Sequence, residues 1–267
     1  MSNDVQGMAE RASRSRSFEW VARVGYVGSG VVHLLIAWIA GRVALGSSGE
    51  ADQTGALEQL GSTGGGNILL WVCAAGFAAL ALWQLVEAVV PHRGSKREQL
   101  GDRVKAVGKA LVYGGLAVTA FRVVTGSGSG GEASSEATSS LMAAPAGRIL
   151  VGVVGLVVLG VGAYHVYKGA KRKFREDLSG TGNREISRAV TVLGVVGYVA
   201  KGVALAVMGG LFLTAAVQAD PNQPTGLDAA LKALRDQPLG VVLLLVVAAG
   251  LAAYGLYSFA RARYSRM

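Results

Sequence analysis

The sequence has few charged residues and almost no cysteine. Charged residues make up 16% of its 267 residues, whereas a typical soluble domain has about 25%. A single cysteine, Cys73, cannot form an internal disulfide, and it lacks the partners that a cysteine-based metal or redox centre needs. These shortages exclude a disulfide scaffold and argue against an ordinary soluble domain.

Catalytic signatures are missing too. The sequence contains no Walker phosphate loop, no His-Glu-x-x-His zinc motif and no aspartate pair for metal-assisted phosphate chemistry. The run Gly64 to Gly66 follows no strand, so it does not form a dinucleotide-binding fingerprint. We therefore expect no enzyme activity and no cofactor.

Long apolar runs dominate the chain instead. Hydrophobic residues account for 51% of it, and about 20 consecutive apolar residues cross the hydrocarbon core of a bilayer as a helix. The sequence therefore predicts an all-α integral membrane protein with six transmembrane helices. These span Val24 to Leu45, Ile68 to Val90, Val107 to Thr125, Ile149 to Tyr167, Val190 to Val217 and Leu239 to Ala260.

The segments between the runs alternate in charge. The N-terminal tail, the second and fourth loops and the C-terminus are rich in Arg and Lys. The first loop has acidic residues and no Lys or Arg, the third has two acidic residues and one terminal arginine, and the fifth mixes two basic with three acidic residues. Because basic loops stay in the cytoplasm, we expect a multi-pass protein of the cell inner (plasma) membrane with both termini cytoplasmic. These loops account for the net charge of +9, so we expect no nucleic acid partner.

The even-numbered spans repeat one pattern. Gly66, Gly147 and Gly240 each open a span, and 81 and 93 residues separate them. Seventeen residues further on, each span has an aromatic–polar pair: Trp83-Gln84, Tyr164-His165 and Tyr257-Ser258. These pairs are typical of an interfacial aromatic belt.

The odd-numbered spans repeat with nearly the same offsets, 80 and 92 residues, and Gly25-Tyr26 matches Gly197-Tyr198. We therefore expect three two-helix hairpins, residues 21–100, 101–188 and 189–267, after a cytoplasmic tail of residues 1–20. Two crossings return the chain to its starting side, so the repeats are parallel and not inverted.

Two of the acidic loops carry patterns of their own. Leu227, Leu231 and Leu234 recur at helical spacing between polar residues, which predicts a short amphipathic helix on the outer surface. The stretch Gly126 to Ser140 is rich in Gly and Ser, which predicts a flexible linker.

Three features stand out together: the three hairpins, the two Gly-Tyr pairs and the segment Gly162 to Gly169 (GAYHVYKG). In these features the chain resembles the bacterial domain-of-unknown-function 1206 family, and the resemblance covers nearly the whole chain. The second repeat has Lys105-Ala106 where Gly-Tyr is usual. The resemblance implies a three-repeat membrane fold and no established activity. A bias toward Ala, Val, Gly and Arg favours a high-GC bacterium.

Ionisable residues inside the spans are the candidate functional residues, because a charge in hydrocarbon is costly. Five of them form the candidate intramembrane polar site: Lys201, Lys109, Glu87, His33 and His165. Lys201 lies about ten residues into its span, about 15 Å along the helix and beyond easy snorkelling. The repeat offsets align it with Ser29 and Lys109.

A buried lysine needs a partner, and two kinds are open. Glu87, the only acid in a predicted span, would pair with Lys201 or Lys109. Alternatively, the lysines hold an anion or a lipid head group. Lys168 lies close to an interface, where we expect it to snorkel to water. Two histidines in helices suggest haem, but His33 and His165 lie at different depths, which argues against it.

These features favour a non-catalytic accessory or scaffold protein. The alternative is a small-solute or ion transporter or channel that uses the polar site, and an enzyme acting on lipid is the third possibility. The expected partners are the bilayer itself and either anionic lipid or another membrane protein. Oligomeric state cannot be derived from the sequence.

Overall fold

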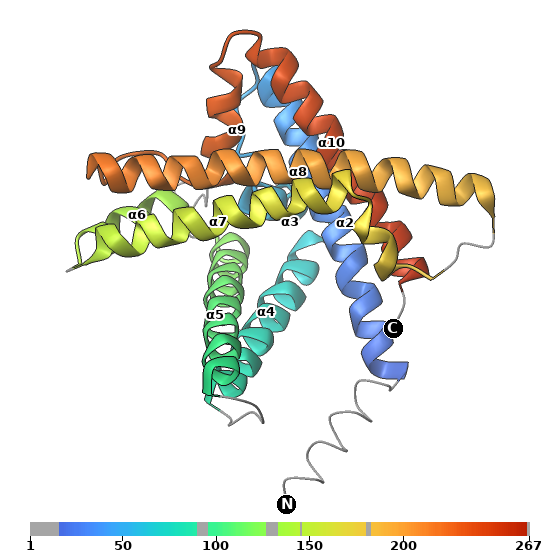
Figure 1. Ribbon diagram of the computed structural model, residues 1–267, viewed down its shortest axis with the longest axis horizontal. Coiled ribbons are helices and arrows are strands. Elements are labelled where there is room, and N and C mark those ends of the chain that lie inside the picture. Colours follow the sequence, from blue (N-terminus) through green and yellow to red (C-terminus); the bar gives the residue numbers. More distant parts are fainter. Residues whose placement is uncertain (1–15, 90–95, 127–132, 145, 180–182, 266–267) are drawn as a thin grey trace, which may run out of the picture. The chain divides into compact units, whose positions relative to one another are not determined.

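The computed structural model describes residues 16–89, 96–126, 133–144, 146–179 and 183–265, and these residues are mostly helical (Figure 1). The elements are α2 (Arg16–Ala44), α3 (Gln53–Gly61), α4 (Gly66–Val89), α5 (Lys96–Val124), α6 (Ala133–Met142), α7 (Gly147–Ala170), η1 (Lys173–Asp177), α8 (Arg184–Gln218), α9 (Leu227–Arg235) and α10 (Gly240–Tyr264).

Six of the described helices are long and apolar enough to cross a membrane, and they match the six predicted spans. The crossing segments are Gly25–Ala44, Gly66–Val86, Ala106–Val124, Gly147–Ala170, Arg184–Gln218 and Gly240–Tyr264. Large apolar side chains face outward from them. On α7, for example, Ile149, Leu156 and Val157 are 68%, 60% and 59% exposed, as a lipid-facing helix requires. The chain is a multi-pass membrane protein.

The chain divides into two compact units. The larger unit comprises residues 1–53 and 133–267 and contains α2 and α6 to α10. The smaller unit comprises residues 54–132 and contains α4, α5 and nearly all of α3. In the smaller unit α4 packs along α5. There Leu57 of α3 joins Leu70, Ala74 and Ala120 in an apolar core.

Close backbone contacts join α7 to α8 in the larger unit. The two helices run side by side in opposite directions (Figure 1). A Cβ atom added to Gly162 would lie 2.8 Å from the Gly202 carbonyl oxygen, and one added to Gly202 would lie 2.7 Å from that of Gly162. Gly155 and Gly209 meet in the same way. Glycine therefore lets these backbones touch, which is how helices associate in lipid.

The same contact recurs between α2 and α10. There Gly30 meets the carbonyl oxygen of Gly255, and Gly255 meets that of Gly30, at 3.0 and 2.9 Å from the added Cβ atoms. The offset of 93 residues maps Gly162 onto Gly255. The combined offset of 172 residues maps Gly30 onto Gly202. The two helix pairs thus use equivalent glycines.

Helices therefore pair between repeats as well as within them. Second helices pack against the first helix of the following repeat, as α4 does with α5 and α7 with α8, and α10 of the last repeat packs against α2 of the first. The offsets place Ala81 and Ala110 of the α4–α5 pair at the glycine positions. In the third repeat α8 also packs against α10, where Gly197 meets Tyr254. The predicted hairpin is thus the unit that repeats in the sequence, but most of the close helix contacts form between hairpins.

The acidic loops contain short helices, and one of them corrects a prediction. Residues 133–140 belong to α6, so the flexible linker predicted over Gly126 to Ser140 is wrong for that part; residues 127–132 lie outside the described residues. The loop resembles its counterparts in the other repeats: α3, α6 and α9 begin 80 and 94 residues apart, close to the repeat offsets. The Ser- and Thr-rich composition suggested a linker, but these residues have only a modest helix propensity cost and can form a helix.

A tight corner joins each short helix to the next span. The amide of each span-opening glycine donates a hydrogen bond to a carbonyl three residues earlier: Gly66 to Thr63, Gly147 to Ala144 and Gly240 to Gln237, at 2.9, 2.9 and 2.7 Å. A Cβ atom on any of the three would overlap a carbonyl oxygen of the preceding helix. This steric limit explains why glycine stands at all three positions.

The amphipathic helix predicted near Leu231 is α9, and its apolar side is buried by the protein. Ala230 and Leu231 are fully buried, and α9 packs against α8 and α10. Asp228 accepts a hydrogen bond from the Ala51 amide at 2.9 Å and forms a 2.6 Å ion pair with Lys232. The helix therefore covers the end of the larger unit at which the acidic first and fifth loops meet, which we call the acidic end.

The glycine contact leads to a stability prediction. We expect Gly162→Ala to lower the free energy of unfolding by about 1–3 kcal/mol, because its Cβ would press on the α8 backbone. Gly160→Ala, on an open part of α7 with no atom within 4 Å of its Cβ, is the matched control and should be neutral or slightly stabilising. Thermal unfolding of the purified protein in detergent measures both. Equal effects of the two substitutions would refute the contact.

Candidate polar site at the basic end of the larger unit

Aromatic rings gather beside the end of α7, next to the basic loop that leads to α8. We call this region the basic end. Tyr198 of α8 is the central ring. Phe174 of η1 and His165 of α7 stack on it at 5.4 and 5.6 Å between centroids, and Tyr254 and Tyr257 of α10 meet it edge-on at 5.3 and 5.5 Å. We call these rings the Tyr198 cluster. It joins α7, η1, α8 and α10.

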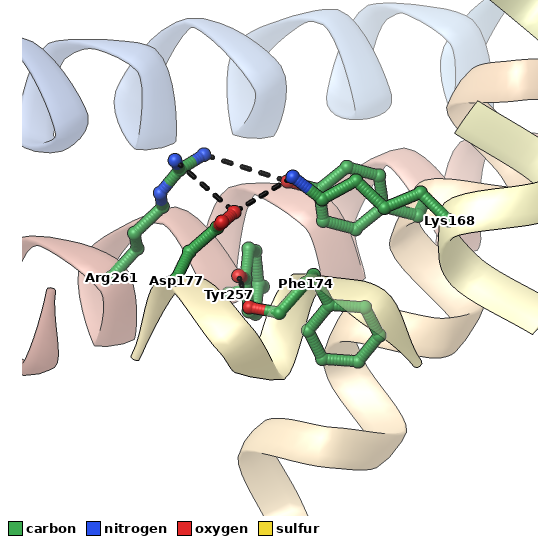
Figure 2. Close-up of polar contacts among 6 residues, drawn as sticks. Lys168, Phe174, Asp177, Tyr257 and Arg261 are labelled. Atoms are coloured by element: carbon green, nitrogen blue, oxygen red, sulfur yellow. Dashed lines mark hydrogen bonds and ion pairs between the residues drawn. The ribbon is translucent and has the colours of Figure 1, made fainter. Parts of the chain in front are cut away.

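Asp177 binds two cations beside this cluster. Figure 2 shows Lys168 of α7 and Arg261 of α10 reaching toward its carboxylate from two sides, with N–O distances of 2.7 and 3.4 Å. The three side chains are 17–30% exposed. The prediction that Lys168 reaches the interface is not contradicted, but its ammonium is paired with a carboxylate of the basic loop, nine residues further along the chain.

The tyrosines of the two Gly-Tyr pairs converge on Arg261. Its Nη1 donates a hydrogen bond to the Tyr198 hydroxyl at 3.5 Å, and its guanidinium lies over the Tyr26 ring at 4.5 Å. A planar guanidinium suits both contacts, since it stacks on rings and donates several hydrogen bonds. Arg261 thus holds the equivalent tyrosines of repeats one and three.

Lys201 lies one turn beyond Tyr198 on α8, further from the basic end. It is half-buried, and its ammonium lies 4.3 Å from the centre of the Tyr254 ring. The electron-rich face of an aromatic ring attracts a cation, the more so away from water. A tyrosine ring is a partner that the sequence-based prediction did not include.

Both predicted histidines belong to this region. Nδ1 of His33 lies 2.7 Å from the Ser29 carbonyl oxygen, and Nδ1 of His165 lies 2.8 Å from that of Val161. A carbonyl only accepts, so each Nδ1 carries the proton and donates it one turn back along its own helix. The His33 ring also contacts Tyr254 at 4.7 Å.

The structure brings three of the five candidate residues into one unit. Lys201, His33 and His165 lie in the larger unit, and Lys109 and Glu87 lie on α5 and α4 of the smaller unit. Lys109 is exposed, and the Glu87 side chain lies outside the described residues. The pairing of Glu87 with Lys201 or Lys109 therefore stays a prediction.

Asp177 is the residue that the sequence-based prediction missed. Only acids inside predicted spans were considered, and Asp177 lies in a basic loop. One signal was available: the repeat offsets align Lys168 with Arg261, and these two equivalent cations meet on the same carboxylate. In the part of the chain that the structure describes, no three His, Cys, Asp or Glu side chains gather as a metal site requires.

The repeats in the sequence correspond to a known family. A family model described as Domain of Unknown Function (DUF1206) matches residues 24–90, 104–172 and 196–265. The chain belongs to this family. The three matched segments confirm the three-fold repeat, and their starts are separated by the predicted 80 and 92 residues. Tyr198, Tyr254, Tyr257 and Arg261 lie in the third family segment, and Lys168 lies in the second.

A bacterial relative matches nearly the whole chain. The chain is 28% identical to the uncharacterized protein YxxB of Bacillus subtilis (strain 168) over 248 residues, which covers 92% of this chain and 90% of the relative. No solved structure matches the chain. The family and this relative are consistent with a membrane protein whose molecular activity is undetermined.

A double-mutant cycle tests the contact of Lys201 with Tyr254. Tyr254→Leu removes the ring face, whereas Tyr254→Phe keeps it. We expect the loss of stability caused by Tyr254→Leu to shrink by about 1–2 kcal/mol in a Lys201→Met background, because the cation that the ring stabilises is already gone. Tyr254→Phe should show no such coupling. Chemical unfolding in mixed micelles measures the four free energies.

The same cycle with Glu87→Gln tests the predicted ion pair. If Lys201→Met destabilises the protein and Glu87→Gln restores it, the acid is the partner of the lysine. Coupling to Glu87 without coupling to Tyr254 would contradict the cation–π contact.

Proposed function

We propose that the protein is a non-catalytic accessory or scaffold protein of the bacterial plasma membrane. One observation carries the proposal: the polar side chains around the Tyr198 cluster are engaged by neighbours of the same chain. Lys168 and Arg261 share Asp177, Lys201 lies over Tyr254, and both histidines donate to backbone carbonyls. Groups committed to internal contacts favour a structural role over chemistry on a substrate.

The extent of lipid-facing surface supports the same proposal. Long apolar faces on α4, α5 and α7 are exposed, and the loops that join the helices are short. The bilayer covers these faces, and another membrane protein can pack on them. At the basic end Lys171, Arg172, Lys173 and Arg175 are exposed, which suits contact with anionic head groups.

A second candidate is a small-solute or ion transporter or channel. The observation in its favour is the position of Lys201 far inside a span, where its side-chain nitrogen lies over the Tyr254 ring that also contacts His33. Ionisable groups gathered at membrane depth often mark an ion or proton path. On this alternative Lys201 carries the function and its contact with Tyr254 is a resting state.

Flux measurements separate the two candidates. The purified full chain is reconstituted into liposomes, and the fluxes of protons, potassium and chloride are followed with fluorescent indicators. The accessory role predicts fluxes equal to those of protein-free liposomes, with no effect of Lys201→Met. A flux that Lys201→Met abolishes, while the melting temperature stays within a few degrees, would replace the accessory role by the transport role.

Co-purification supplies the positive test of the accessory role. The protein is extracted with its native lipids in polymer nanodiscs and analysed by mass spectrometry. We expect a second membrane protein in near-stoichiometric amount. Its absence from nanodiscs that retain the full chain would count against an accessory role.

We also propose that both termini and the basic loops lie in the cytoplasm, because of the charge alternation. In a Cys73→Ala background, Ser48→Cys tests an acidic loop and Glu176→Cys tests a basic one; both positions are exposed. A membrane-impermeant maleimide should label Ser48→Cys in intact cells, and Glu176→Cys only after permeabilisation. The reverse pattern would invert the topology.

A further inference from the structure

The short helix η1 is inserted into the basic end of the larger unit. Its Phe174 is fully buried and packs against Tyr198 and against the edge of Tyr257, with centroids 5.4 and 5.2 Å apart. The Tyr257 hydroxyl donates a 3.5 Å hydrogen bond to the Phe174 carbonyl (Figure 2). Gly194 of α8 makes room for the ring, since a Cβ atom there would overlap it. The loop thus fills space between α8 and α10.

Ionic and backbone contacts fasten this segment from its far side. Asp177, the last residue of η1, binds Lys168 of α7 and Arg261 of α10. Directly after it, Leu178 forms an antiparallel bridge with Ser265, and the Ser179 amide and hydroxyl donate to the Tyr264 carbonyl at 2.8 and 2.9 Å. The ends of α7 and α10 are therefore tied through one carboxylate and a short stretch of backbone.

Other features of the segment make it suited to release. Arg172, just before η1, has a left-handed backbone conformation with φ of 55°, which non-glycine residues adopt at a cost and which favours a bend in the chain. The Asp177 ion pairs are 17–30% exposed, so water and salt weaken them more than they would a buried pair. The two cations repel each other once the carboxylate charge is removed.

The Tyr198 cluster lies directly behind the segment. Phe174 stacks on Tyr198, which also stacks on His165, and Tyr254 links this array to Lys201. Withdrawal of Phe174 would therefore uncover the ring that leads toward the deepest lysine of the larger unit.

We propose that residues 173–177 form a releasable plug at the basic end, held in place by a latch in which Asp177 binds Lys168 and Arg261. With the latch closed, Phe174 seals the Tyr198 cluster from water. With the latch open, the segment between the bend at Arg172 and the bridge at Leu178 moves outward and the cluster becomes accessible. This device does not depend on whether the protein is an accessory protein or a transporter, and its test does not measure either role.

Thiol accessibility in nanodiscs containing the full chain tests the plug. The reporter is Ser258→Cys in a Cys73→Ala background: Ser258 is 3% exposed, lies one turn from Arg261 on α10, and cysteine is close to it in size. We expect Asp177→Asn to raise its rate of reaction with a charged maleimide about tenfold or more, because the latch loses its charge. Glu176→Gln, the neighbouring exposed carboxylate, is the matched control and should leave the rate unchanged.

A second reporter distinguishes release from unfolding. Val43→Cys lies on α2 near the acidic end and is 1% exposed. Release of the plug predicts that Asp177→Asn accelerates labelling of Ser258→Cys and leaves labelling of Val43→Cys at its original rate. If both reporters accelerate together, Asp177 is a general stabilising residue and the plug is refuted. If Ser258→Cys reacts at the same rate with Asp177→Asn as with Glu176→Gln, the latch is refuted as well.

Discussion

Direct backbone contact at glycine is the constraint on which the larger unit depends. In lipid, apolar side chains gain little by leaving one apolar surface for another, so helices associate through close packing. Gly162 with Gly202, and Gly30 with Gly255, bring α7 to α8 and α2 to α10 close enough for the backbones to touch. Contacts at the basic end that join α7 to α8 or α2 to α10, such as His165 with Tyr198 and Arg261 with Tyr26, depend on these two pairs.

These glycine pairs show how the three sequence repeats pack together. Three copies of a helix–loop–helix sequence would suggest three self-contained hairpins, yet the equivalent glycines lie on helices of different copies. The last helix, α10, packs against the first, α2, in the way that α7 packs against α8. Such pairing links the repeats to one another, because each of these mutual glycine contacts joins two different copies. Helices that are far apart in the sequence, such as α2 and α10, therefore depend on each other for their packing.

Charges inside the spans are accommodated by two different physical means. At the basic end, where water reaches, one carboxylate stabilises two cations that would otherwise repel each other. Further along α8, Lys201 lies against the Tyr254 ring, whose quadrupole attracts an ammonium without adding a negative charge to the apolar interior. The two means suit their depths in the membrane. A carboxylate serves near water, whereas deeper in the hydrocarbon an ionised acid would itself need stabilisation. Asp177 forms the first arrangement and supports the second indirectly, because it fixes η1 over the cluster that contains Tyr254.

The sequence by itself determined the membrane class, the six spans, the three-fold repeat and the glycines that open the even spans, because each depends on local pattern: apolar length, loop charge and recurrence. It also placed Lys201, His33 and His165 among the candidate residues, since polar groups inside an apolar run are conspicuous. Only the tertiary structure decided their partners. Asp177 and Arg261 are 84 residues apart in the chain, and no local pattern records that α7 and α10 end beside the same loop. The composition of the third loop likewise gave no sign of α6, which begins 80 residues after α3 and corresponds to it in the repeat. Contacts between repeats depend on how helices cross, which a one-dimensional periodicity does not specify.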